Sequence, residues 1–548
     1  MPKTTLNIDV LGCSIPISAE EEEKYLNRLL EAYKKKLSEI RGNTGLNDPL
    51  KIAILTGFLL CDDCEKIRLE KMAPDLTRST DTKVSEGTTT QDRQDSNQET
   101  ANTAENKEAE KLTQNLIYRL EHIFNPENIG AIYKLKNPIK NYEWGSPEWI
   151  PELLGIINEA IIPCAEVWMG VHPEGPSEII LPDGETEELG ELIYRNPSEF
   201  LGEERAKIFG GLPFLFKILA AEKPLSIQAH PSLAQAKNGW DRENTIGIPL
   251  DSPERNYKDP NHKPEIICAL SPFTAMAGFR EPNKIKANLE DFLLNAPQSL
   301  VTALKPLTEA LEGENPLKTF LQELFSLSPF VRKALGNYVK GISAHGNNAN
   351  ENISQYPEEW KLISQFAELF PDDPAIISPL YLNLIQLNPG EALYLPAGIL
   401  HAYIHGLGVE LMANSNNVLR GGLTPKHIDI PELLRVLDFS PYKPAILNGA
   451  EETSESKLSG EYEYPVPCKE FSLSVIKGGD HIYLETGPSI ILVTQGELRI
   501  SGPSETVLKR GESAFIPAGN NGLKFTGAYT VYAAGTGPLS ETNNANPG

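Results

Sequence analysis

The sequence has few cysteines, no long apolar run and a deficit of positive charge. Its six cysteines are scattered over 548 residues, which is typical of a protein in a reducing compartment and provides no disulfide framework. The longest apolar run, residues 52–61, is much shorter than the roughly 20 residues that cross a bilayer. Met1-Pro2-Lys3 leads directly into a strand pattern, without a signal segment. We therefore expect a cytoplasmic protein with no membrane anchor.

The deficit of positive charge argues against large anionic partners. Lysine and arginine together number 50 against 75 acidic residues, so the net charge is −25. A surface of this sign repels nucleic acid and anionic lipid, and we expect neither as a partner. An anionic substrate would need a local basic pocket. The hydrophobic content of 40% and the charged content of 23% are those of a globular protein, and the length predicts several domains.

Residues 1–75 form a small α+β module of their own. Alternating apolar residues at 6–10 and 15–17 predict a β-hairpin, and two helical patterns follow it. Such a unit buries little core alone, so we predict that it dimerises. Cys61 and Cys64 form a C-x-x-C pair in the second helical pattern. A redox or zinc site there is an alternative, but no second pair lies nearby to support it.

This module resembles the cell-division protein ZapA, which decorates the FtsZ ring. The resemblance is carried by the motifs NIDVLG at 7–12, EEEEKYL at 20–26 and LNDPLKIAIL at 46–55. It implies self-association or contact with FtsZ through residues 1–75, and a plain dimerisation module is the alternative. The sequence departs from the ZapA pattern after Met72, where the long coiled coil of that family is cut short.

The rest of the chain divides into segments of different character. Residues 76–111 have almost no sizeable apolar side chain and cannot offset the entropy of ordering, so they are predicted to be a disordered linker. Residues 281–375 carry apolar residues at helical spacing and form an α-helical insertion. The remaining predicted segments are a catalytic β domain at 112–280 and 376–445, a C-terminal β domain at 446–536 and a disordered tail at 537–548.

Four polar residues in the catalytic segment carry metal-ligand chemistry. Gln228 and His230 are two apart, so on a strand both side chains point to one face. His401 follows residues 388–398, a turn–strand–turn pattern that resembles the way cupin barrels present a metal ligand to their interior. With Glu265 they supply two imidazoles, one carboxylate and one amide oxygen, a set that suits zinc and leaves it a Lewis acid. Spacing alone leaves hydrogen-bonded core histidines as the alternative.

The predicted fold class follows from these patterns. It is mainly β, with cupin-type double-stranded β-helix barrels in the catalytic and C-terminal segments. An α-helical insertion interrupts the catalytic barrel, and the small α+β module precedes it. One zinc ion per chain is the predicted cofactor.

Several long motifs, in order along the chain, resemble type I mannose-6-phosphate isomerases (phosphomannose isomerases) over residues 131–536. They are NYEWG at 141–145, AEVWMGVHP at 165–173, LPFLFK at 212–217 and NVLRGGLTPK at 417–426. The resemblance implies that Gln228, His230, Glu265 and His401 are zinc ligands. It also implies that the chain interconverts mannose 6-phosphate and fructose 6-phosphate through an enediol.

Three further residues are candidates for catalysis. Lys263 is a candidate for proton transfer beside the metal, with substrate holding as the alternative. Arg420 is predicted to contact either the enediol oxygens or the phosphate. Glu410 matches an acidic position of the family and serves in proton relay, or is a buried carboxylate that orients its neighbours.

Four residues are candidates for substrate binding. Lys426 is predicted to be a second phosphate partner, while Trp144, Tyr403 and Ser226 are predicted to line the pocket, with ordinary core packing as the alternative. Asn416 replaces an aspartate that the family usually carries, which puts any role of a carboxylate there in doubt. It also leaves a second hypothesis, a catalytically degenerate sugar-phosphate-binding scaffold linked to the division ring.

Overall fold

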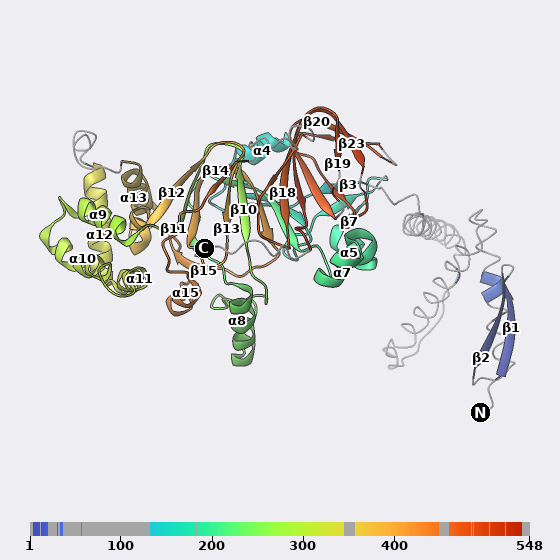
Figure 1. Cartoon of the computed structure of the whole chain (residues 1–548), viewed down its shortest axis with the longest axis horizontal. Coiled ribbons are helices and arrows are strands. Elements are labelled where there is room, and N and C mark those ends of the chain that lie inside the picture. The colour runs from blue at the N-terminus through green and yellow to red at the C-terminus, as the bar shows by residue number, and fades with distance from the viewer. Residues whose placement is uncertain are drawn as a thin grey trace, which may run out of the picture. The chain divides into compact units, whose positions relative to one another are not determined.

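A computed structural model of the chain is shown in Figure 1. It describes residues 4–10, 13–19, 30, 33–36 and 56, and then 132–539 without 182, 345–356, 449–459, 484, 486, 503–504 and 521. The chain divides into two compact units, Met1–Glu110 and Lys111–Gly548.

In the first unit, the predicted hairpin is confirmed. Strand β1 (Thr4–Val10) pairs antiparallel with β2 (Cys13–Ala19). Of the two predicted helices, residues 30, 33–36 and 56 are described, and all are helical. The C-x-x-C pair, the predicted linker at 76–111 and most of the predicted tail lie outside the described residues.

The second unit is mostly antiparallel β-sheet with helices, as the sequence predicts. Its first sheet has eleven strands. They are β4 (Ile139–Lys140), β5 (Glu166–Gly170), β8 (Phe214–Ala221), β9 (Ile227–Ala229), β10 (Glu265–Ala269), β11 (Phe273–Phe279), β12 (Leu382–Leu387), β13 (Glu391–Leu395), β14 (His401–Ala413), β15 (Leu419–Gly422) and β16 (Ile446–Asn448).

Strand β14 joins two halves of this sheet. Its first residues pair with β9 and β11, and its later residues pair with β8 and β10. The change of partners falls at Gly406, whose φ of +134° is open to glycine but not to other residues. The two halves enclose an apolar layer that includes Phe273, Leu395 and Tyr403. Side chains on the inner faces of the two halves therefore meet.

The second sheet has ten strands and combines distant parts of the chain. They are β3 (Tyr133–Lys136), β6 (Glu178–Ile180), β7 (Thr186–Glu188), β17 (Glu461–Tyr464), β18 (Ser472–Lys477), β19 (His481–Tyr483), β20 (Ser489–Ser501), β21 (Glu505–Lys509), β22 (Ser513–Ile516) and β23 (Leu523–Gly535). Strand β3 pairs with β22 and β6. Strands from both sides of the predicted boundary at residue 445 thus share one sheet, and the domain boundaries stay a prediction.

The predicted helical insertion forms a helical layer beside β12 (Figure 1). Its helices are α9 (Pro282–Leu293), α10 (Gln298–Ala310), α11 (Pro316–Ser326), α12 (Pro329–Ala344) and α13 (Pro357–Leu369), followed by the 3-10 helix η3 (Pro374–Ile377). All of these except α10 begin at a proline, which suits the first helical position because its missing N–H needs no partner there. Their apolar faces share a core with Met276, Ala402 and Leu419 on the outer face of the sheet.

The other described helices connect the strands. They are α4 (Trp149–Leu154), α5 (Leu189–Arg195), α6 (Pro197–Leu201), α7 (Glu203–Phe209), α8 (Leu233–Ile246), α14 (Ser378–Tyr381) and α15 (Ile430–Val436). A capping box formed by Ser232 and Gln235 starts α8, directly after β9. Among the described residues, no helix has the length and apolar character needed to cross a membrane.

Gly406→Ala is expected to destabilise the second unit. A Cβ there would lie 2.6 Å from Cδ2 of Phe273 and 2.8 Å from its Cα. Backbone strain and overpacking together predict a loss of about 2–5 kcal/mol in the free energy of unfolding, measured by denaturant titration. Gly390→Ala is the control, because φ is +91° there but no atom lies within 4 Å. An equal loss in both variants would show that the contact with Phe273 does not require glycine.

Candidate metal centre

One row of side chains crosses three neighbouring strands on the inner face of the sheet. Gln228 of β9 pairs with His401 of β14 on one side and with Arg420 of β15 on the other. The residues that flank Gln228 along the strand, Ile227 and Ala229, belong to the core shared with the helices. Because side chains alternate along a strand, Gln228 points the opposite way, toward the interior between the two halves. The paired residues share that face.

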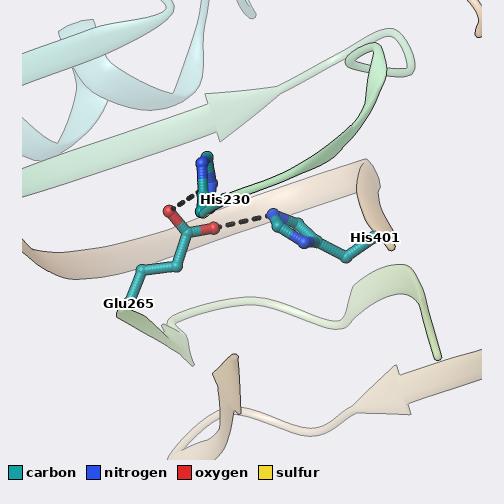
Figure 2. Close-up of side chains that lie close together, drawn as sticks. All are labelled: His230, Glu265 and His401. Carbon is teal, nitrogen blue, oxygen red and sulfur yellow. Dashed lines mark ion pairs between the residues drawn. The ribbon is translucent and has the colours of Figure 1, made fainter. Parts of the chain in front are cut away.

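The other half of the sheet supplies a carboxylate. Glu265 begins β10, and Ile267 two residues later lies in the inner apolar layer. Figure 2 shows Glu265 between His230 and His401. The Nε2 atom of His401 is 2.9 Å from Glu265 Oε1, and that of His230 is 3.3 Å from Glu265 Oε2. One ligand atom from each of the three residues lies within 4.8 Å of the others, so all could contact a single ion.

Backbone carbonyl groups fix the tautomers of both histidines. The Nδ1 atom of His230 lies 2.8 Å from the carbonyl oxygen of Asn417, and that of His401 lies 2.9 Å from the carbonyl oxygen of Ile399. A carbonyl can only accept a hydrogen bond, so each Nδ1 carries the proton. Each Nε2 therefore presents a lone pair toward Glu265, as a metal-binding histidine does.

The donor set fits a metal ion better than it fits a closed hydrogen-bond network. Glu265 Oε2 and His401 Nε2 are fully buried and have no hydrogen-bond partner of normal geometry among the described residues. Unpaired buried polar atoms are costly and rare in native structures. Two imidazole nitrogens and a carboxylate are also typical zinc ligands. The structure thus brings together three of the four residues that the sequence predicts as ligands, and their role as ligands stays a prediction.

Lys263 and Tyr403 complete the surroundings of Glu265. Lys263 Nζ lies 3.2 Å from Glu265 Oε2, and the Tyr403 hydroxyl donates a hydrogen bond to Oε1 at 3.1 Å. Burial opposes ionisation of Glu265, but the charge of Lys263 and the contact with His230 hold its pKa well below the usual value. Burial, with Lys263 acting in the same direction, lowers the pKa of His230 to about 4. At neutral pH this gives an ionised carboxylate and a neutral imidazole, the forms that bind a metal.

A second buried charge cluster adjoins the first. Lys217 Nζ lies 2.8 Å from Glu410 Oε2 and 3.7 Å from Glu166 Oε1, and all three side chains are buried. Burial alone would lower the pKa of Lys217, but Glu166 and Glu410 more than offset it and raise that pKa. Burial raises the pKa of Glu410; the charge of Lys217 opposes this shift, and the negative charge of Glu265 adds to it. Lys217 is therefore charged at neutral pH.

Lys217 and Glu166 were not among the residues that the sequence singled out. The signal was present in β8, where Lys217 is the one charged side chain in the otherwise apolar run FLFKILAA. A charge on such a strand needs a buried partner of opposite sign. The identity of that partner, however, depends on the register of β8 with β5 and β14, which spacing along the chain does not give.

A cavity of about 690 Å³ opens beside the two clusters. All the predicted substrate-binding and catalytic residues line it, together with one of the proposed ligands. They are Trp144, Ser226, Gln228, Lys263, Tyr403, Glu410, Arg420 and Lys426. The volume is in the range typical of small-molecule sites.

One wall of this cavity is positively charged. Burial lowers the pKa of the Arg420 guanidinium, and burial followed by the charge of Arg420 lowers the pKa of Lys426. Lys258 adds to the same effect on Lys426. Among the described residues, neither Arg420 nor Lys426 has a carboxylate within 4.0 Å. In a protein of net charge −25, this wall is suited to an anion.

Asn416 does not line the cavity. Its Oδ1 lies 2.9 Å from Nε2 of His172, and its Nδ2 donates to Glu174 at 3.3 Å. The backbone N–H of Asn416 donates to Asp259. The Asn416 side chain therefore contacts His172 and not the cavity. An aspartate at this position would not add a carboxylate to the cavity wall.

Comparison with known proteins places the chain in a family. Residues 132–282 match the family described as phosphomannose isomerase type I, catalytic domain. The mannose-6-phosphate isomerase of Salmonella typhimurium is 41% identical over 418 residues, which cover 75% of this chain and 99% of the relative. The human mannose-6-phosphate isomerase is 32% identical over 424 residues, which cover 72% of this chain and 96% of the relative.

Solved structures agree with this placement. The crystal structure of a zinc-bound mannose 6-phosphate isomerase is 37% identical, with a TM-score of 0.66, and covers 74% of this chain and 100% of that one. Fold and site together define an isomerase with a buried His–Glu–His cluster beside a cationic cavity. The chain belongs to the type I mannose-6-phosphate isomerase family, which confirms the resemblance seen in the sequence.

The N-terminal unit has a different relative. Residues 6–116 match the family described as cell division protein ZapA, so this resemblance is also confirmed. The match continues across residues 76–111 and therefore extends further than the sequence motifs indicate.

Lys217→Met is expected to destabilise the enzyme strongly. It leaves two carboxylates buried without a cation, and breaking a buried ion pair in this way costs about 3–5 kcal/mol in the free energy of unfolding. Adding Glu410→Gln should recover part of that loss, which a double-mutant cycle measures by denaturant titration. Lys134→Met is the control, because its ion pair with Glu512 is exposed and should be worth about 1 kcal/mol or less. Strict additivity of Lys217→Met and Glu410→Gln would contradict the pairing.

Proposed function

We propose that this protein is a zinc-dependent isomerase that interconverts mannose 6-phosphate and fructose 6-phosphate. The observation that carries the proposal is the buried His230–Glu265–His401 cluster beside a cavity with unpaired cations. The similarity to mannose-6-phosphate isomerases supports it, since the chain covers 99% of the length of the Salmonella typhimurium enzyme. A scaffold that only binds sugar phosphate would not need a complete set of metal-binding side chains. We therefore favour an active enzyme over the alternative of a sugar-phosphate-binding scaffold.

We assign four residues to the metal. His230, Glu265 and His401 would hold zinc directly, and Gln228 is the fourth ligand because its side chain shares a face and a cross-strand position with His401. A bound zinc would act as a Lewis acid that polarises the substrate carbonyl and stabilises the developing oxyanion. The carbonyl partners of the two Nδ1 atoms keep both rings in place for this purpose.

The remaining charged residues serve the substrate. Isomerisation moves a proton between C1 and C2, so a base must lie beside the metal. We assign this proton transfer to Lys263, whose Nζ lies beside Glu265, and the relay of the hydroxyl proton to Glu410 on the cavity wall. Arg420 and Lys426 are the phosphate partners, because they supply unpaired positive charge on one wall of the cavity. Trp144, Tyr403 and Ser226 shape the remaining wall.

Four broader assignments complete this proposal. The two halves of the eleven-stranded sheet, which enclose an apolar layer around β14, form a cupin-type barrel, and the C-terminal strands form a second one. The two barrels and the helical insertion are the domains, with the boundaries that the sequence predicts.

The N-terminal unit associates with itself or with the division protein FtsZ, as its match to ZapA suggests. The protein works in the cytoplasm, where the free Cys164, Cys268 and Cys468 remain reduced.

His230→Ala is expected to abolish turnover by removing a metal ligand. Zinc affinity should fall by more than the roughly 10–100-fold typical of losing an outer-shell partner. Zinc content is measured by elemental analysis, and turnover by a coupled assay of fructose 6-phosphate formation. His405→Ala is the control, because His405 lies on the same strand but contacts Trp149 instead. Full zinc content in His230→Ala would remove this residue from the ligand set.

Lys263→Ala separates proton transfer from substrate holding. If Lys263 moves a proton, kcat should fall by about 10²–10⁴-fold with little change in KM. Steady-state kinetics with zinc-replete enzyme gives both constants. A rise in KM at unchanged kcat would instead assign the residue to substrate binding.

A further inference from the structure

Leu423 carries a strained backbone at the edge of the site. Its φ is +52°, in the left-handed region that a leucine rarely adopts. Its side chain is 2% exposed and lies in the core shared with the helical insertion. Arg420 lies three residues before Leu423 and Lys426 three residues after it. The backbone at Leu423 therefore influences where both cations stand in the cavity.

Asp373, at the end of the helical insertion, holds this backbone in place. Its Oδ2 accepts a hydrogen bond from the Leu423 N–H at 2.7 Å, and the carboxylate also accepts the Thr424 N–H. Its Oδ1 accepts the Ala375 N–H at 2.8 Å, which starts η3. A carboxylate that uses both oxygens on backbone N–H groups makes stronger bonds than a neutral acceptor. Strain at Leu423 persists only where such bonds over-determine it.

Close packing supports the same contact. Gly422 has φ of +132°, and a Cβ there would lie 2.2 Å from the Cβ of Ala375. The turn from residue 373 to 375 is thus pressed against the end of β15. Leu369 and Phe370, directly before this turn, line the cavity. The end of the insertion therefore lines the cavity and also contacts the segment that carries Arg420 and Lys426.

We propose that Asp373 is a positioning residue for the phosphate-binding cations. It holds the backbone N–H groups of Leu423 and Thr424, with Leu423 in its left-handed conformation, and so fixes where Arg420 and Lys426 lie, without itself lining the cavity. This inference rests on the proposed function, because it assigns the two cations to the phosphate. It gives the helical insertion a part in substrate recognition.

Asp373→Asn tests the proposal at constant side-chain volume. The amide loses the charge and one of the two acceptor oxygens, so KM for mannose 6-phosphate should rise about 10-fold or more. The zinc content should stay at the wild-type level, and kcat should change much less than KM. Asp183→Asn is the matched control, because Asp183 also accepts a backbone N–H, from Glu185, but in an exposed loop. Its kinetics should equal those of the wild type.

A second background shows whether the effect passes through the cations. In Lys426→Ala, which removes one of the clamped charges, adding Asp373→Asn should raise KM by a much smaller factor. An equal factor in both backgrounds, or a wild-type KM in Asp373→Asn, would overturn the positioning role. A wild-type enzyme without isomerase turnover would reject the proposed function itself, and the positioning role would fall with it.

Amide hydrogen exchange in the wild-type protein covers the case in which Asp373→Asn does not fold. The N–H groups of Leu423 and Thr424 should exchange more slowly than that of Lys426, which donates to the exposed hydroxyl of Thr424. Exchange at Leu423 as fast as at Lys426 would overturn the clamp.

Discussion

The burial of one carboxylate between two imidazoles is the constraint on which this site depends. Glu265 is 1% exposed, and a charge that far from water is tolerated only when positive or hydrogen-bonding groups surround it. The fold meets this need from separate strands, since β10 brings Glu265, β14 brings His401 and Tyr403, and the end of β9 brings His230. Each of these groups is further fixed by a partner, which leaves little freedom for the ligand atoms.

The charged side chains around Glu265 form one electrostatic cluster. Glu166, Glu265 and Glu410 bring three acidic side chains together, and Lys217 and Lys263 bring two basic ones. The cluster therefore has one acidic group in excess. A divalent cation held by His230, Glu265 and His401 would offset that excess and favour the binding of oxyanions. Arg420 and Lys426, which also line the cavity, add to the same attraction.

Much of this site could be predicted from local sequence. The parts that could not be predicted depend on contacts between residues that lie far apart in the chain. The spacing of Gln228 and His230 predicts two side chains on one face because strand geometry has a period of two residues. In the structure β9 carries Gln228 and ends at Ala229, directly before His230. The hairpin and the helical insertion follow in the same way from periodicity. The roles of Lys217 and Asp373 could not be predicted, because their partners lie 193 and 50 residues away and are set by strand register and packing. Likewise, no local pattern indicates that β3 joins a sheet built from the other end of the chain.

The pairing of β3 with β22 has a consequence for how the protein is made. Leu135 pairs with Ile179 of β6 on one side and with Ser513 of β22 on the other. The edge of β3 that pairs with β22 must therefore wait for nearly the whole chain to leave the ribosome. The N-terminal unit, by contrast, is complete before the isomerase begins to be translated. An association of that unit with a second nascent chain would hold two unfinished isomerase sheets close together, at the stage when exchanged strands are most easily formed.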